Sequence, residues 1–533
     1  MKANWTKNND QMTGNLFSSH YDSLKVFFAL FIASLFFFCF PEPISASEDP
    51  RLIEREYETT AVHWQLARWS NGESVCSVFM RNNKQPSADD ILDNCGYQTF
   101  IEWMTTPACN DVLPGTGGTS CQGLLIRSIG EEKHVFSELL QLPKIHLQAQ
   151  SVNCVPGDWC AENPELNLMG IEPVDGYNIE RLYVRIGGVL HVCEGQICTV
   201  NLPQTGNDGG WLEYWAQSDF GDESDVVQIK FRNVKINSDS DTYRVDILGD
   251  DFIEYAPSGS IIWEIFPPID GNLPTILEQP FSAGYLMTTN RYVYLAGYLI
   301  KHRYVNADTC PGGGLSENMI ATPCGEKAAA DQVLEWQNKY NDQIFNASIK
   351  YNVPARVLKG IIAQESQFWP QSDSPYELGL GMVTENGVDL LLLWNPSYYL
   401  SVCIPLFQET RCSSGYDNLS EIEKTYLKRK ALDKIGTDEE IDLLAATLLA
   451  SAVQSNQLVK NSAGKSVSWV STYEDMWKFT IGNYNAGSGC LGTAMNSVYE
   501  EQSSILWEDV ENILVGDCGE AGEYVEKVFS ITQ

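Results

Sequence analysis

Alternating apolar and polar residues predict β-strands through most of the first half of the chain. The clearest strands are 179–186, 189–193, 197–202, 212–218, 226–234 and 243–248, and Gly-Gly and Glu-Gly pairs separate the first three. Because successive side chains of a strand point to opposite faces, this alternation places one face of each strand on a core. We expect the first three strands to form a meander of hairpins.

The short strands and their turns rich in glycine, asparagine and aspartate favour an immunoglobulin-like sandwich across 151–305. Within this region, the pattern over 251–305 predicts further strand-like segments that proline and glycine interrupt. Residues 47–150 contain strands near 62–69 and 75–80 and a helix that begins at Ser87, a good N-cap. We therefore expect a small β or α+β module before the sandwich, tied by disulfides.

The period of the apolar positions changes in the second half of the chain. Apolar residues recur every three or four positions from 330 onward, which predicts one long amphipathic helix over 333–345 and an Ala- and Leu-rich helix over 443–458. A Gly-rich connector held by two cysteines, 306–329, precedes them. The pattern predicts a multidomain chain in which β-rich modules are followed by an α-helical domain, 330–533.

Composition and charge narrow the class of protein. The chain has 533 residues, of which 44% are hydrophobic and 20% charged, as expected for globular domains. Its net charge of −35 and its pI of about 4.4 argue against a nucleic-acid partner, because DNA and RNA binding depends on a basic surface.

The first 46 residues have the pattern of a signal peptide. Lys25 precedes an apolar run over 26–40, and a small-residue site, Ile44-Ser45-Ala46, follows it. The run is short for a membrane span, which needs about 20 residues. We expect cleavage near Ala46 and a secreted or cell-surface protein; because the polar stretch before the run is long, an uncleaved anchor is the alternative.

The cysteines support export. One of the 15, Cys39, lies in the apolar run, and the other 14 fall in neighbouring pairs with no Cys-x-x-Cys and few histidines nearby. We expect no metal site and seven local disulfides, which indicate an oxidising compartment. The expected pairs are Cys76–Cys95, Cys109–Cys121, Cys154–Cys160, Cys193–Cys198, Cys310–Cys324, Cys403–Cys412 and Cys490–Cys518.

One acidic residue lies on an apolar stripe. After Pro354, which suits the first position of a helix, apolar residues recur at Val357, Leu358, Ile361 and Ile362, and helical spacing brings Glu365 onto the same face. Burial favours the protonated form of a carboxyl, which is the form that a general acid needs to protonate a glycosidic oxygen. The alternative is an ordinary carboxylate at a fraying helix end.

The residues around and after Glu365 resemble the catalytic domain of the soluble lytic transglycosylase family, which has a goose-lysozyme-like fold and cleaves peptidoglycan glycan strands. The resemblance covers 330–533 and rests on motifs that occur in the family's order. They are Glu365-Ser366, Phe368, Pro370, Ser374-Pro375, Gly379-Leu380-Gly381-Met382, Asn483-Tyr484-Asn485-Ala486-Gly487 and Tyr524-Val525-Glu526-Lys527-Val528.

The resemblance implies a set of site residues and no cofactor. Glu365 would be the acid and then the base, and Tyr484 would hold Glu365 or the oxocarbenium-like sugar. The substrate-binding positions would be Ser366, Met382, Thr384 and Asn485. The chain departs from the family where Val383 occupies the position of a glutamine, with Thr384 the nearest polar substitute, and where Asn483 replaces an alanine.

The sequence lacks the residues that several other kinds of catalysis or metal binding require. Residues 326–533 contain no histidine, so that domain alone has neither a Ser-His-Asp triad nor a histidine-bound zinc, and no phosphate-binding Gly-rich motif occurs. Asn237, Asp239 and Asp241 alternate like ligands of a calcium loop but lack its glycine and distal glutamate.

The expected function is cleavage of the MurNAc–GlcNAc bond of peptidoglycan by an exported lytic transglycosylase. The β modules would bind a carbohydrate or wall ligand or act as spacers; Trp159, Trp211, Tyr214 and Trp215 could stack on sugars or simply pack. Two alternatives stay open. One is a wall-binding or adhesion protein with a weakened lysozyme-like domain, and the other is a hydrolase that uses Asp373, Glu377 or Glu385 as a second carboxylate.

Overall fold

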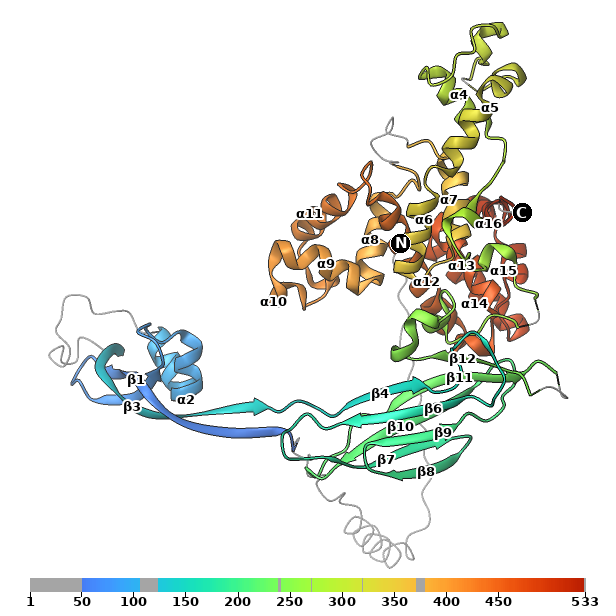
Figure 1. Cartoon of the computed structure of the whole chain (residues 1–533). Helices are drawn as coiled ribbons and strands as arrows, with labels where there is room; N and C mark the ends of the chain where they lie inside the picture. Colours follow the sequence, from blue (N-terminus) through green and yellow to red (C-terminus); the bar gives the residue numbers. More distant parts are fainter. Residues whose placement is uncertain are drawn as a thin grey trace, which may run out of the picture. The chain divides into compact units, whose positions relative to one another are not determined.

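The computed structural model describes residues 50–105, 123–237, 241–269, 271–318, 320–370 and 379–531. The expected signal peptide lies outside these ranges. The chain divides into two compact units, Met1–Lys144 and Ile145–Gln533. Antiparallel sheets come first along the chain and a helical region follows, as expected for a multidomain protein (Figure 1).

The first unit is a three-stranded antiparallel sheet with one helix. Its strands β1 (Leu52–Arg68), β2 (Ser74–Met80) and β3 (Leu124–Gln141) lie in the order β2-β1-β3. Helix α2 (Ala88–Thr105) packs on β2, and the hydroxyl of Ser87 accepts a hydrogen bond from the amide of Asp90, as a cap should. The sequence predicted the second half of β1, strand β2 and this helix start, but it missed the first half of β1 and all of β3.

Two sheets form the first part of the second unit. The larger has the order β5 (Trp159–Cys160), β12 (Tyr243–Leu248), β11 (Val227–Lys235), β10 (Gly210–Ser218), β7 (Ile179–Ile186) and β8 (Val189–Glu194). The smaller has the order β4 (His146–Ser151), β6 (Glu165–Ile171) and β9 (Ile197–Asn201). Buried side chains from both sheets make one hydrophobic core, so the two sheets pack face to face.

The predicted meander is wrong at its third strand. Strands β7 and β8 form the expected hairpin, but β9 crosses to the smaller sheet and pairs with β6. The reason is burial: Cys198 and Val200 of β9 lie opposite Leu168 and Leu166 in the core, whereas most of β8 is exposed.

The prediction of strands over 251–305 is also wrong for the described residues of that stretch. The stretch forms helical turns, and most of its buried apolar residues pack into the helical region, although Phe252 belongs to the core between the sheets. The indole of Trp263 is fully buried 4.9 Å from the ring of Trp477 and donates to the carbonyl oxygen of Ala452. The elements are η2 (Asp250–Tyr255), α3 (Ser260–Trp263), η3 (Thr275–Leu277), η4 (Ala283–Leu286) and α4 (Val293–Lys301).

The helical region is built around one long helix, α12 (Glu440–Ala463). It packs against α6 (Asn341–Tyr351), α8 (Glu385–Trp394), α13 (Tyr473–Ala486) and α14 (Ser488–Gln502). The predicted helix over 333–345 is broken between Asn338 and Asn341, where one helix ends and the next begins. The remaining helices are α5 (Pro323–Asn338), α7 (Ala355–Ser366), α9 (Pro396–Phe407), α10 (Glu409–Cys412), α11 (Glu421–Leu432), α15 (Trp507–Ile513) and α16 (Glu520–Ser530), with the short turns η5 (Pro311–Gly314), η6 (Tyr416–Asn418), η7 (Val467–Trp469) and η8 (Gly516–Gly519).

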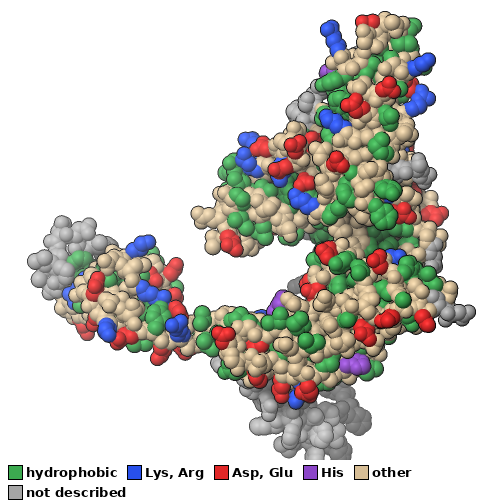
Figure 2. All heavy atoms as spheres, viewed as in Figure 1, with side chains coloured by type: hydrophobic (Ala, Val, Ile, Leu, Met, Phe, Trp, Pro, Cys, Tyr) green, Lys and Arg blue, Asp and Glu red, His purple; other side chains and the backbone are tan. Residues whose placement is uncertain are grey.

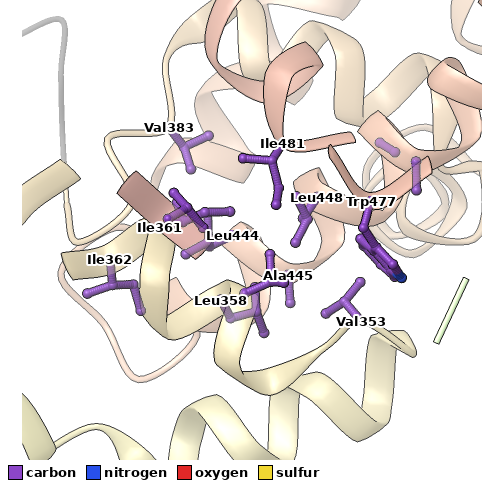
Figure 3. Close-up of a cluster of buried hydrophobic side chains, with 14 of the residues drawn as sticks. Val353, Leu358, Ile361, Ile362, Val383, Leu444, Ala445, Leu448, Trp477 and Ile481 are labelled. Atoms are coloured by element: carbon purple, nitrogen blue, oxygen red, sulfur yellow. The ribbon is translucent and has the colours of Figure 1, made fainter. Parts of the chain in front are cut away.

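The predicted apolar stripe of α7 faces the centre of this core. Leu358 and Ile361 of α7 are fully buried in the cluster that includes Leu444 and Leu448 of α12 and Ile481 of α13 (Figure 3). Burying an aliphatic side chain contributes roughly 1.5–3 kcal/mol, so this stripe fixes α7 in the core. Every residue that α7 presents near its C-terminal end is positioned by that packing.

Six of the seven predicted disulfides are confirmed. They are Cys76–Cys95, Cys154–Cys160, Cys193–Cys198, Cys310–Cys324, Cys403–Cys412 and Cys490–Cys518, and the seventh, Cys109–Cys121, lies outside the described residues. These bonds indicate an oxidising environment. Over the ranges given above, no single helix is long and apolar enough to cross a membrane; one bent pair, α8 with α9, meets the criteria of length and composition.

Candidate active site

The end of α7 presents Glu365 from a turn in an unusual conformation. Glu365 is half-buried in the last turn of α7. Gln367 and Phe368, which follow Ser366, have φ angles of 47° and 64°. Side chains other than glycine rarely adopt this left-handed region, which costs on the order of 1–3 kcal/mol at each residue. The side-chain oxygen of Gln367 accepts from the amide of Tyr294 at the start of α4, so the turn is held by the helix beside it.

One side chain that contacts the Glu365 carboxylate comes from the last helix. The hydroxyl of Tyr524 in α16 donates to Oε1 of Glu365 at 2.6 Å, and Tyr524 is 7% exposed. Burial, together with the charge of Glu365, raises the pKa of Tyr524 well above its ordinary value, so its proton is retained. A hydrogen bond to an ionised group is about twice as strong as one between neutral groups, so Tyr524 orients the carboxylate.

Tyr484 has a different partner from the one that the resemblance implied. Its hydroxyl donates at 2.5 Å to the carbonyl oxygen of Gly381. Burial and the nearby charge of Glu365 raise the pKa of Tyr484 as well. Tyr484 therefore joins the end of α13 to the turn at 379–384 and lies close to Glu365 without donating to it.

The turn at 379–384 is clamped onto α12. A Cβ atom on Gly379, whose φ is 84°, would collide with the carboxylate of Glu440, and one on Gly381 would lie 2.7 Å from the side chain of Leu444. The Glu440 carboxylate accepts from the backbone amides of Leu380 and Gly436. Both glycines are therefore required for the turn to approach α12 closely enough to form one wall of the site.

These elements enclose a cavity of about 210 Å³. Five of the six site residues expected from the sequence line it together: Glu365, Met382, Thr384, Tyr484 and Asn485. The other lining residues are Val383, Gly387, Leu390, Thr447 and Ser451.

Ser366 is placed elsewhere. It is 4% exposed, is not among the described residues that line the cavity, and donates its hydroxyl proton to the carbonyl oxygen of Ile362 at 3.0 Å. This hydrogen bond to the preceding helical turn is the usual arrangement for a serine inside a helix. Thr384 lines the cavity and also caps α8, because its hydroxyl accepts from the amide of Gly387 at 3.1 Å.

Sequence reasoning missed two hydroxyl residues of the cavity. Thr447 and Ser451 lie four residues apart on α12, and each donates to the carbonyl oxygen four residues earlier, at 2.8 and 3.1 Å. The available signal was this spacing of hydroxyl residues in an Ala- and Leu-rich helix, which places them on one face.

Among the described lining residues, Glu365 is the only acid. Glu385 is exposed at the first position of α8 and does not line the cavity, and Asp373 and Glu377 lie outside the described residues. Over the same described ranges, no group of three or more histidine, cysteine, aspartate or glutamate residues could hold a metal ion. Glu365 is therefore the one carboxyl that the described lining residues offer for acid–base chemistry.

Of the four aromatic residues considered as a sugar-stacking face, Tyr214 lies on the opposite face of the sheet from the other three. Tyr214 is 1% exposed and belongs to the core between the sheets. Trp215 lies on the opposite face of β10, where its ring stacks on Tyr183 at 5.2 Å, and Trp211 and Trp159 are about two-fifths exposed. For Tyr214, the alternative that the ring packs in the core rather than stacking on a sugar is therefore confirmed.

A buried lysine anchors the helix that carries Glu365. Lys359 of α7 is fully buried, and its ammonium group donates to the side-chain oxygens of Asn338 and Asn341, both at 2.8 Å, and to the carbonyl oxygen of Leu286. Burial lowers the pKa of Lys359 to about 7. These contacts join α7 to α5, to α6 and to the segment before α4.

Lys359 should make the thermal stability of the helical region depend on pH. The unfolded chain keeps this proton to about pH 10.4, whereas the folded chain releases it above about pH 7, so stability should rise between these values by up to about 1.4 kcal/mol per pH unit. Lys359→Met should remove that rise in calorimetric scans at pH 7, 8, 9 and 10, and the exposed Lys327→Met should retain it. Parallel pH profiles for wild type and Lys359→Met would contradict the prediction.

Comparison with known proteins identifies no relative: no protein-family model matches the chain, and no curated protein matches its sequence. The likeness to soluble lytic transglycosylases therefore rests on the motif residues, four of which the structure gathers around one cavity.

Proposed function

We propose that the chain is an exported lytic transglycosylase that cleaves peptidoglycan glycan strands. The observation that carries the proposal is the cavity in which Glu365, oriented by the hydroxyl of Tyr524, is the only acid among the described lining residues. Glycosidases that use water or form a covalent intermediate need two carboxyl groups. A single carboxyl fits a reaction in which the substrate supplies its own nucleophile.

In the proposed reaction, protonated Glu365 gives its proton to the oxygen between MurNAc and GlcNAc, and the bond from that oxygen to C1 of MurNAc breaks. The sugar passes through an oxocarbenium-like state. The Glu365 carboxylate then removes the proton of the C6 hydroxyl, whose oxygen bonds to C1 and closes a 1,6-anhydro ring. No water is consumed, and the intramolecular attack benefits from proximity.

The other assignments follow from this proposal. The helical region would be a lysozyme-like catalytic domain, and the two packed sheets an immunoglobulin-like module that binds a wall carbohydrate or acts as a spacer. The disulfides suit secretion by the N-terminal signal, because peptidoglycan lies outside the cytoplasm.

One observation favours a second candidate, a wall-binding protein with weak turnover. Val383 lines the cavity at the position of the family's glutamine, so an amide that could hold the sugar is absent there. Zymography separates the two functions: the purified chain should clear a gel containing peptidoglycan. Binding to the same peptidoglycan without clearing would support the wall-binding protein, and clearing with reducing products only would support a hydrolase.

A further inference from the structure

A second cavity continues from the first along the same three elements. It has a volume of about 540 Å³ and shares Leu390 of α8 with the cavity of Glu365. On α12 the lining passes from Ser451 to Gln454, the next turn on the same face, and at the end of α13 it passes from Asn485 to Gly487. A substrate held at Glu365 can therefore extend into the second cavity.

The far wall of this second cavity is charged. Helix α11 contributes Lys424 and Lys428, which pair with Glu421 at 3.2 Å and with Asp389 at 3.1 Å. Asp389 also accepts a hydrogen bond from Tyr416. The paired acids are well exposed, at 86% and 44%, and such surface pairs contribute only about 0–1 kcal/mol, so a bound ligand can replace them.

The position of these lysines is unusual for this protein. In a chain with a net charge of −35, α11 carries four basic residues between 424 and 430, and two of them line the cavity. Figure 2 shows Lys and Arg side chains near α11, with Asp and Glu among them. The basic residues are therefore placed where the cavity could meet an anionic group.

The mixture of charges indicates the chemistry of the ligand. Tyr416 and Trp394 of the lining would suit a sugar ring, but neutral sugars carry no charge to match the lysines and carboxylates that face the same cavity. A short peptide with free carboxylates and an ammonium group matches both signs. Peptidoglycan is a glycan that carries such peptides as branches.

We propose that the second cavity binds the peptide branch of the substrate. Lys424 and Lys428 receive its carboxylates, and Asp389 and Glu421 receive its ammonium group. The identity of the substrate rests on the proposed function, but binding of the peptide to this cavity can be measured without any turnover.

The first arm of the test compares two substrates, intact peptidoglycan and the same glycan stripped of peptides by an amidase. Wild type should cleave the intact form with the lower KM, and Lys424→Gln with Lys428→Gln should reduce that preference about five- to tenfold, as expected for losing two partly exposed ion pairs. Arg429→Gln with Lys430→Gln makes the same change of charge on α11 outside the cavity and should keep the preference.

The second arm uses the Glu365→Gln chain and a synthetic tripeptide, alanyl-glutamyl-lysine with free carboxylates, in calorimetric titrations. Binding that weakens about five- to tenfold with the two cavity lysines changed, and not with the control pair, supports the cavity. No binding, or equal binding by both double variants, overturns it. If wild type cleaves neither glycan, the proposed function fails, and the tripeptide titration alone decides on the cavity.

Discussion

Replacing Glu365 with glutamine is expected to lower the rate of glycan cleavage by about 10²–10⁴-fold, because glutamine can neither donate nor recover a proton. The fold should be retained. The amide has the volume of the carboxyl, and its oxygen can still accept the hydrogen bond from Tyr524. Since Glu365 is half-buried, removing its charge should leave stability unchanged or slightly raised.

Glu385→Gln is the matched control for this substitution. Glu385 directly follows Thr384, a residue that lines the cavity. Its own side chain is exposed at the start of α8 and does not line the cavity. Release of soluble fragments from purified peptidoglycan should be lost in Glu365→Gln and kept in Glu385→Gln, with equal circular dichroism spectra. Full activity of the folded Glu365→Gln chain would remove Glu365 from the proposed reaction.

Tyr524→Phe is expected to reduce kcat by about 10- to 100-fold, the range expected when a carboxylate loses a hydrogen bond worth about 1.5–3 kcal/mol. Tyr524 orients Glu365 and contacts no substrate in this proposal, so KM should change little. Because the ionised carboxylate loses a donor while the protonated form is the reactive one, the alkaline limb of the pH–rate profile should move to higher pH.

Tyr499→Phe serves as the control for Tyr524→Phe. Tyr499 is partly buried on α14, away from the residues that line the cavity, and its substitution should leave both kcat and the pH profile unchanged. If Tyr524→Phe lowered only stability, or raised KM with an unshifted pH profile, Tyr524 would have a structural role alone.

Local patterns in the sequence predicted the elements that carry the site. The stripe of Leu358 and Ile361 places Glu365 at the edge of a core, and the burial of α7 confirms that stripe. Neighbouring cysteines predicted six bonds correctly because a disulfide between near neighbours closes a short loop that local turns already favour. The N-cap at Ser87 is also a local signal, because its hydrogen bond reaches only to Asp90, three residues later.

Features that depend on distant partners could not be predicted in this way. The contact between Tyr524 and Glu365 joins residues 159 positions apart, and no periodicity near either residue indicates it. The crossing of β9 to the smaller sheet depends on its pairing with β6. Trp263 has a pattern compatible with a strand, and only its packing on Trp477 draws the surrounding segment into the helical region.

Mass spectrometry of digested peptidoglycan tests the proposed reaction most directly. The full chain would be incubated with purified peptidoglycan, and the released disaccharide fragments would be weighed without chemical reduction. Ring closure by the C6 hydroxyl predicts fragments lighter by one water than those with a free reducing end, and it predicts their loss with Glu365→Gln. Reducing fragments alone would contradict the transglycosylase reaction and direct the search for a second carboxylate to Asp373 and Glu377.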